Sequence, residues 1–292
     1  MSNLITVARV QQYRANVQTK YQRQGSLLHN AVRFQEIKAK YHFWELLAQT
    51  AATKKTVRHG PTILVNSQHE RRRSEFSDYE WSDLIDSEDK LRMIIDPESD
   101  YVTNASYAMG RALDQEIINS FDALAYEGET GSSSVAWAVD GPGGTGNIIV
   151  NGGTGLTVGK LRQTMQLLDS ANVGPMDRFF AMSPIGKQDL LEDAQVTSTD
   201  FASVKALVNG EVDTYMGFKF IMHTGLSKAA NIRTCWAWSK NAVGVHTPNE
   251  LSVDIGPRRD LSNAIQVLVK GSYGAVRIQG AGVVQIDIDE SA

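Results

Sequence analysis

The pattern of hydrophobic and polar positions predicts one long helix over residues 97–121. Asp96 is a favoured N-cap residue, and Pro97 suits the first helical position. Small and apolar residues then recur along one side of this segment: Tyr101, Ala105, Ala108, Ala112, Ile117 and Phe121. A stripe of small residues lets a helix pack closely across a sheet, so we expect a scaffold helix here.

Residues 1–52 are predicted to be helical, in two helices separated at Gly25. Along the second helix, large apolar residues recur at spacings of three and four, which places them on one stripe: Phe34, Ile37, Tyr41, Trp44 and Leu47. Such a stripe has to be buried. Two alternatives stay open: a core helix of the same chain, or an arm packed on a neighbouring copy.

Residues 53–95 lack helical periodicity and predict a long hairpin. We expect its charged tip at Arg71, Arg72 and Arg73, followed by a returning strand over residues 74–85. On that strand Tyr79 and Trp81 share one face with charged and polar neighbours. Because neither face is uniformly apolar, the hairpin is not a core strand pair. We expect it to lean on another chain; the alternative is a solvated tip that makes no specific contact.

The rest of the chain alternates short strands with helices. Helices are predicted after Thr157, an N-cap residue followed by the staple residue Leu161, and from Pro184 onward. Strands are predicted at residues 134–139, 147–150, 179–182, 212–221, 234–238, 251–255, 264–270, 274–279 and 283–288. This succession indicates a mixed fold of helices and sheets.

Composition fits a globular protein: 42% of the 292 residues are hydrophobic and 21% are charged. No apolar run approaches about 18 residues, and no export signal is evident, so we expect no membrane insertion. The single cysteine excludes an intrachain disulfide and favours synthesis in a reducing cytoplasm.

The net charge of −4 is distributed unevenly. Residues 1–60 hold ten Lys or Arg against two Glu, so a basic arm of net charge +8 precedes an acidic body. Such an arm can bind nucleic acid, or it can dock on the acidic surface of a neighbouring copy.

Signals for catalysis are weak. The glycines before Lys160 do not form a phosphate-binding loop, because only three residues separate Gly155 from Gly159 and Leu161 follows the lysine. Cys235 is expected to be inert packing in a buried strand. The histidines are dispersed: His29, His42, His59, His69, His223 and His246. We therefore predict no catalytic, cofactor-binding or metal-binding residue, and a protein that is not an enzyme.

Several short motifs resemble one known family. The segment from residue 71 to 118 contains SDYEW, LID, DKLR and IDP in order, and Tyr273-Gly-Ala-Val-Arg277 is followed by Gly282-Val-Val. With the order of hairpin and long helix, these motifs resemble the major capsid proteins of tailed bacteriophages, over nearly the whole chain from residue 54. The resemblance implies an α+β fold of the Hong Kong 97 type.

This resemblance also implies a division of the chain. Residues 1–52 would form an N-terminal arm, and residues 53–95 the extended loop known as the E-loop. Residues 96–150 and 240–292 would form the peripheral domain, with its spine helix at 97–121. Residues 151–239 would form the axial domain.

The function implied is structural. Subunits would assemble as pentamers and hexamers into an icosahedral shell around phage double-stranded DNA, contacted non-specifically. Further partners would be a separate scaffolding protein, since only about 50 residues precede the loop, together with a portal and a decoration protein. Assembly would take place in the host cytoplasm, giving a virion capsid. The expected contacts between subunits are Phe34, Ile37, Tyr41, Trp44, Arg71, Arg72, Arg73, Tyr79 and Trp81.

Two alternatives stay open. An encapsulin-type nanocompartment shares this fold but encloses cargo enzymes. A cytoplasmic α/β enzyme, or a nucleic-acid-binding module whose basic arm grips DNA, is the more distant alternative. DNA or cargo protein inside purified shells would separate the first pair, and measurable turnover by a monomer would support an enzyme.

Overall fold

The structure is a computed structural model that describes residues 22–58, 60–85, 98–192, 214–248 and 252–291. The chain divides into two compact units. The first comprises the described residues of Met1–Ser26, Asp78–Ala112 and Glu250–Gly271, and the second those of Leu27–Ser77, Leu113–Asn249 and Ser272–Ala292. The predicted Asp96 N-cap lies outside the described residues.

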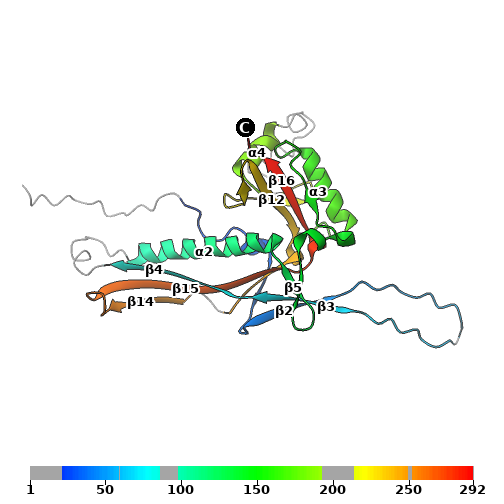
Figure 1. The fold of residues 1–292 in the computed structure, drawn as a ribbon, viewed down its shortest axis with the longest axis horizontal. Helices are drawn as coiled ribbons and strands as arrows, with labels where there is room; N and C mark the ends of the chain where they lie inside the picture. The colour runs from blue at the N-terminus through cyan, green and yellow to red at the C-terminus, as the bar shows by residue number, and fades with distance from the viewer. Residues whose placement is uncertain (1–21, 59, 86–97, 193–213, 249–251, 292) are drawn as a thin grey trace, which may run out of the picture. The chain divides into compact units, whose positions relative to one another are not determined.

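The first unit combines a long helix with a sheet. Helix α2 spans Glu98–Asp122, which confirms the predicted helix, and its residues up to Ala112 belong to this unit. In Figure 1 the axis of α2 follows the same direction as the longer strands of the sheet. The strands are β4 (Ser77–Ile85), β14 (Ser252–Arg258) and the first part of β15 (Ala264–Arg277).

Small residues on α2 allow close packing of the N-terminal segment against the helix. Ala105 is fully buried, and a Cβ added at Gly110 would lie 2.5 Å from the carbonyl carbon of Gly25. A side chain at position 110 would therefore displace the N-terminal segment from the helix. On the strands, Val267 and Val269 are buried as well.

The second unit contains a seven-stranded sheet in the order β7-β16-β12-β8-β10-β9, with β11 paired to β12. Helix α3 (Val158–Ser170) packs against β16 and β7, and α4 (Pro184–Glu192) follows β8. The strands are β7 (Ile148–Ile149), β8 (Arg178–Met182), β9 (Thr214–Tyr215), β10 (Phe218–Met222), β11 (Lys228–Ala229), β12 (Ile232–Ser239) and β16 (Val283–Asp289). Both predicted helices are confirmed, and so are the strands predicted at 147–150, 179–182, 234–238 and 283–288, within a few residues. The single strand predicted over 212–221 is wrong in its described part, because β9 and β10 pair antiparallel across a turn at Met216 and Gly217.

A second sheet of this unit carries the hairpin. Strand β2 (Tyr41–Leu47) pairs antiparallel with β3 (His69–Glu75), and β3 pairs with β5 (Ala125–Glu127), which pairs with β6 (Ser133–Val135). Residues 48–68 join β2 to β3 as a long loop, which extends well beyond the two strands (Figure 1).

The remaining strands form a ladder beside this hairpin. Strand β1 (Arg33–Glu36) runs parallel to β13 (Val243–Thr247), and β13 pairs antiparallel with the second part of β15. Short 3-10 turns complete the described structure: His29–Ala31, Trp137–Val139, Pro142–Gly144, Lys240–Ala242 and Gly280–Gly282.

The helix predicted across residues 34–47 is wrong. Those residues form β1 and β2, two strands separated by residues 37–40, so the spacing of three and four joins residues from different strands. Trp44 is 3% exposed and packs against Val276 and Ile278 of the same chain. Pairing with β13 and β3 supplies the backbone hydrogen bonds that a helix would otherwise make.

The predicted tip of the hairpin is also wrong. Arg71, Arg72 and Arg73 lie inside β3, where Arg72 is opposite Trp44. The first arm of the hairpin is β2, and the tip lies within residues 48–68. Strand β4, predicted as part of the returning arm, pairs with β15 instead.

Candidate assembly loop and the charge network at its base

The loop at 48–68 is the most exposed segment of the hairpin. Its described residues 49–58 and 61–68 are exposed, and a hydrogen bond from the Ala48 amide to the Gln68 carbonyl (2.9 Å) closes its base. It contains Lys54, Lys55 and Arg58 and no Asp or Glu. The loop is therefore a basic segment in a chain that is acidic overall.

The same loop exposes a run of branched apolar side chains. Ile63, Leu64 and Val65 are 65%, 84% and 47% exposed, and Val57 is 65% exposed. Burying such a side chain stabilises a protein by about 1.5 to 3 kcal/mol relative to leaving it in water. A contiguous exposed apolar run is typical of a surface that binds a partner.

The three arginines of β3 have partners within the chain. Arg71 pairs with Glu45 of β2 at 3.2 Å, across the hairpin. Arg73 lies 5.0 Å above the rings of both Tyr41 and Tyr126. These contacts fix the side chains along the strand rather than at a free tip.

Arg72 is buried, and its guanidinium binds two carboxylates. Its Nη2 lies 2.7 Å from Asp140 Oδ1, and its Nη1 lies 3.3 Å from Glu127 Oε2. The Asp140 side chain is only 6% exposed. This ion pair anchors the middle of β3 to the turn that follows Trp137.

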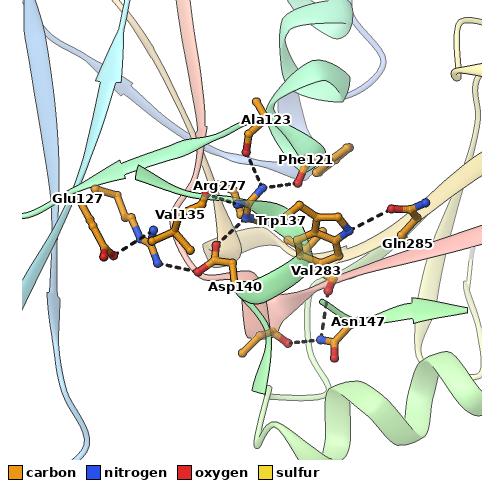
Figure 2. Close-up of polar contacts among 12 residues, drawn as sticks. Phe121, Ala123, Glu127, Val135, Trp137, Asp140, Asn147, Arg277, Val283 and Gln285 are labelled. Carbon is orange, nitrogen blue, oxygen red and sulfur yellow. Dashed lines mark hydrogen bonds and ion pairs between the residues drawn. The ribbon is translucent and has the colours of Figure 1, made fainter. Parts of the chain in front are cut away.

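Asp140 also binds a second buried guanidinium. Its Oδ2 accepts a hydrogen bond of 2.6 Å from Nε of Arg277, which is fully buried (Figure 2). Nη1 of Arg277 donates to the carbonyls of Phe121 and Ala123. The guanidinium lies 5.1 Å above the Trp137 ring. Burial lowers the pKa of Arg277, while the hydrogen bond and charge of Asp140 act in the opposite direction.

The network continues into the seven-stranded sheet. Trp137 Nε1 donates to the side-chain oxygen of Gln285 at 3.0 Å, and Asn147 donates to the carbonyl of Val283 at 3.2 Å (Figure 2). Both acceptors belong to β16. The base of the hairpin is thus tied by polar contacts to the core of the second unit.

Sequence reasoning missed Asp140. Asp140 precedes Gly141 and Pro142, and Asp, Gly and Pro together are typical of an exposed turn. Nothing in the neighbouring residues indicated that its side chain is buried. One signal was available in retrospect: Arg277 interrupts an apolar strand, and a buried arginine needs an acceptor.

The other predicted contact residues are dispersed. Phe34 is half-buried against the His29 ring, at 4.5 Å between centroids, and the Ile37 amide donates to the Thr247 carbonyl. Tyr79 and Trp81 are half-buried on β4, in the first unit. Trp44 belongs to the core.

Lys160 has a structural role. Its ammonium lies within 3.0 Å of four backbone carbonyls, those of Asn151, Thr154, Gly155 and Asp287. Thr157 caps α3 by accepting a hydrogen bond from the Lys160 amide, as predicted. The carbonyls of the glycine-rich segment therefore bind the Lys160 ammonium. In a phosphate-binding loop, the lysine at this place would bind a nucleotide instead.

Cys235 is fully buried, and burial raises the pKa of its thiol to about 12. A thiol of that pKa is a poor nucleophile near neutral pH. Among the described residues, no group of three or more His, Cys, Asp or Glu is placed to hold a metal ion. In the same part of the chain, no helix is long and apolar enough to cross a membrane.

The chain belongs to the phage capsid protein family, whose model matches residues 5–290. A search of curated protein sequences found no match. The protein is accordingly a major capsid subunit that forms a shell in the virion, and the encapsulin alternative is not favoured.

Solved phage capsids share the fold at low sequence identity. The capsid of cyanophage P-SCSP1u is 16% identical, with a TM-score of 0.72 over 98% of this chain and 95% of that one. The matching chain of Mycobacterium phage Che8 is 13% identical, with a TM-score of 0.69 over 94% of this chain and 95% of that one. The capsid chain of cyanophage Pam1 is 11% identical, with a TM-score of 0.70 over 98% of both chains. These similarities confirm the predicted α+β capsid fold.

Proposed function

We propose that residues 48–68 overlap a neighbouring subunit in the shell, and that the closed shell encloses double-stranded phage DNA. The observation that carries this proposal is the exposed apolar run of Ile63, Leu64 and Val65 on a loop whose base is held by buried ion pairs. A rigid base with an exposed apolar end positions the run for burial on another chain.

Charge supports a second copy as the partner. The loop is basic, whereas residues 61–292 together carry a net charge of −12. A basic segment that binds the acidic body of the next copy makes a head-to-tail interface, the type that closes rings of five and six. Many modest contacts of this kind stabilise a closed shell without one strong interface.

We assign the main contact to this loop rather than to the arginines of β3. Arg72 is buried, and its guanidinium already forms ion pairs with Glu127 and Asp140 of the same chain. Arg71, Tyr79 and Trp81 keep exposed or half-buried surface and are proposed as secondary contacts.

The remaining parts of the proposal follow from family membership and charge. Pentamers and hexamers would assemble in the host cytoplasm with a separate scaffolding protein, a portal and a decoration protein. The basic residues that precede β1, residues 1–32, would contact a neighbouring subunit or DNA without sequence specificity. The peripheral and axial domains would have the predicted bounds, and the protein would have no enzymatic activity.

A pair of single substitutions tests the loop contact. Leu64→Asp puts a charge into the apolar run, whereas Ser67→Asp puts the same charge into the same loop outside the run. We expect Leu64→Asp to abolish shells in electron micrographs while the thermal midpoint of the subunit is unchanged. Ser67→Asp should assemble. Normal shells from Leu64→Asp would refute the proposed contact.

A further inference from the structure

Two histidines lie where the β2–β3 hairpin meets strand β13. His42 belongs to β2 and His246 to β13, and their ring centroids are 5.8 Å apart. The His246 ring is 0% exposed, and the Phe76 ring covers it at 4.3 Å between centroids. The two rings are therefore part of the contact between the hairpin sheet and the neighbouring ladder.

One buried hydroxyl connects the two sheets at this point. Ser74 Oγ on β3 lies 3.0 Å from His246 Nδ1, and it accepts a hydrogen bond of 3.3 Å from Trp44 Nε1 on β2. Ser74 is 3% exposed. His246 is thus joined through a single side chain to both strands of the hairpin.

The other ring nitrogen of His246 has no such partner. Its Nε2 is buried and makes no hydrogen bond of good geometry with any described residue. On this side the ring faces Gly274, where an added Cβ would lie 2.2 Å from His246 Cε1 and 2.5 Å from the Glu75 carbonyl. A neutral ring can leave one nitrogen unpaired, but an imidazolium needs an acceptor at both.

The charges near the pair oppose protonation. From β1, the Arg33 guanidinium lies 5.0 Å above the Trp44 ring, beside which His42 packs at 4.7 Å. Burial, followed by the charge of Arg33, lowers the pKa of His42. The β1 residue opposite His246 is the neutral Gln35.

Burial, followed by the charge of His42, lowers the pKa of His246 to about 4, while the main chain of Gly274 acts in the opposite direction. On β15 the neighbouring Tyr273 has its pKa raised by burial and stays neutral. The carboxylate nearest in sequence on β3, Glu75, belongs to an exposed residue. No described carboxylate is among the groups that shift His246.

We propose that His42 and His246 form a proton-sensitive latch, which holds the β2–β3 hairpin on β13 while both rings are neutral and releases it in mildly acidic solution. Release would loosen the end of the hairpin that lies away from the loop at 48–68, and the loop itself would stay tied through the Arg72–Asp140 ion pair. The latch lies within one subunit and does not depend on the proposed function.

The direction of the pH dependence follows from proton linkage. A released His246 has an ordinary pKa of 6.5, whereas the latched ring has a pKa of about 4. The released form therefore binds protons more tightly, and lowering the pH from about 6.5 to about 4 favours it by about tenfold per pH unit. Above that range the balance between the latched and released forms no longer changes with pH.

Hydrogen exchange on the unassembled full-length subunit tests the latch. After correction for intrinsic exchange, opening of β2 and β3 should increase about tenfold or more between about pH 7 and about pH 5.5, while β12 and α3 stay protected. His246→Gln, which keeps a neutral hydrogen-bonding side chain, should remove the part of this increase that comes from His246. His69→Gln removes an exposed histidine from the same hairpin and should respond like the wild type.

Each outcome decides the proposal. Wild-type β2 and β3 that exchange equally at both pH values would overturn it, and so would a wild-type response in His246→Gln. If His246→Gln does not fold, titration of the wild-type histidine Cε1 protons replaces it: a buried histidine that titrates with an ordinary midpoint overturns the latch. Because these measurements use the subunit alone, failure of the latch is distinguishable from failure of the loop contact.

Discussion

At Asp140, one buried carboxylate pairs with two guanidiniums that come from strands far apart in the sequence, Arg72 and Arg277. Burying an ion pair contributes little net stability, but removing one partner leaves a buried charge without compensation. Asp140 therefore determines where the middle of β3 lies, and with it the direction in which the loop leaves the sheet.

Asp140→Asn tests this role. The substitution keeps the shape of the side chain and removes the charge between Arg72 and Arg277, so the free energy of unfolding should fall by about 3 to 5 kcal/mol. Glu45→Gln is the matched control, because it removes a carboxylate from the exposed Arg71 pair and should cost at most about 1 kcal/mol. Urea unfolding of the subunit measures both; equal effects would contradict the assignment.

Gly274→Ala tests the packing around His246. The new methyl group would overlap the imidazole ring and the Glu75 carbonyl, and we expect a loss of about 1 to 3 kcal/mol in the free energy of unfolding. Gly256→Ala is the control, because nothing lies within 4 Å of a Cβ added there. If both alanine variants unfold at the same denaturant concentration, the close packing is not present in solution.

Local signals were sufficient for several elements. The Thr157 cap of α3 is encoded within a few residues, and both α2 and α3 were predicted from sequence. Burial of Asp140 was not predictable, because it depends on Arg72 and Arg277, which are 68 and 137 residues away. Contacts of such separation leave no local pattern.

At the scale of elements, β1 and β2 show where local reasoning fails. The apolar residues between Phe34 and Leu47 fit a helical period, but the segment instead pairs with β13 and β3. A sequence pattern does not contain its pairing partner, which here lies up to about 210 residues away. Tertiary pairing therefore overrides the periodicity.

Trp44→Ala distinguishes the strand from the predicted arm helix. Because Trp44 lies in the core with Val276 and Ile278, its truncation should lower the free energy of unfolding of the isolated subunit by about 3 to 5 kcal/mol. Leu47→Ala, at the exposed end of the same strand, should change it by about 0.5 kcal/mol or less. An isolated subunit of wild-type stability with Trp44→Ala would support the alternative in which Trp44 contacts a neighbour.

At the scale of the whole molecule, family membership and fold place the protein in the capsid shell, while charge and exposure indicate how copies meet. The fold was predictable from short motifs and the order of elements. The contact surface proposed for the loop was not predicted from the sequence, because the basic cluster expected to make the contact, at residues 71–73, lies inside a strand.

Reversing the loop charges tests the electrostatic part of assembly. Replacing Lys54, Lys55 and Arg58 with Glu should block assembly without changing the thermal midpoint of the subunit, because none of the three is buried. Wild-type assembly should weaken in about 1 M salt, where the screening length falls to about 3 Å. If neither the Glu substitutions nor the added salt weakens assembly, the apolar run alone makes the contact.

The central claim, that this chain closes into a shell, is tested most directly by electron microscopy of the purified full-length protein, with scaffolding protein supplied. We expect closed particles built of rings of five and six subunits, and megadalton species in sedimentation. A protein that stays monomeric at every concentration and salt tested would contradict the claim.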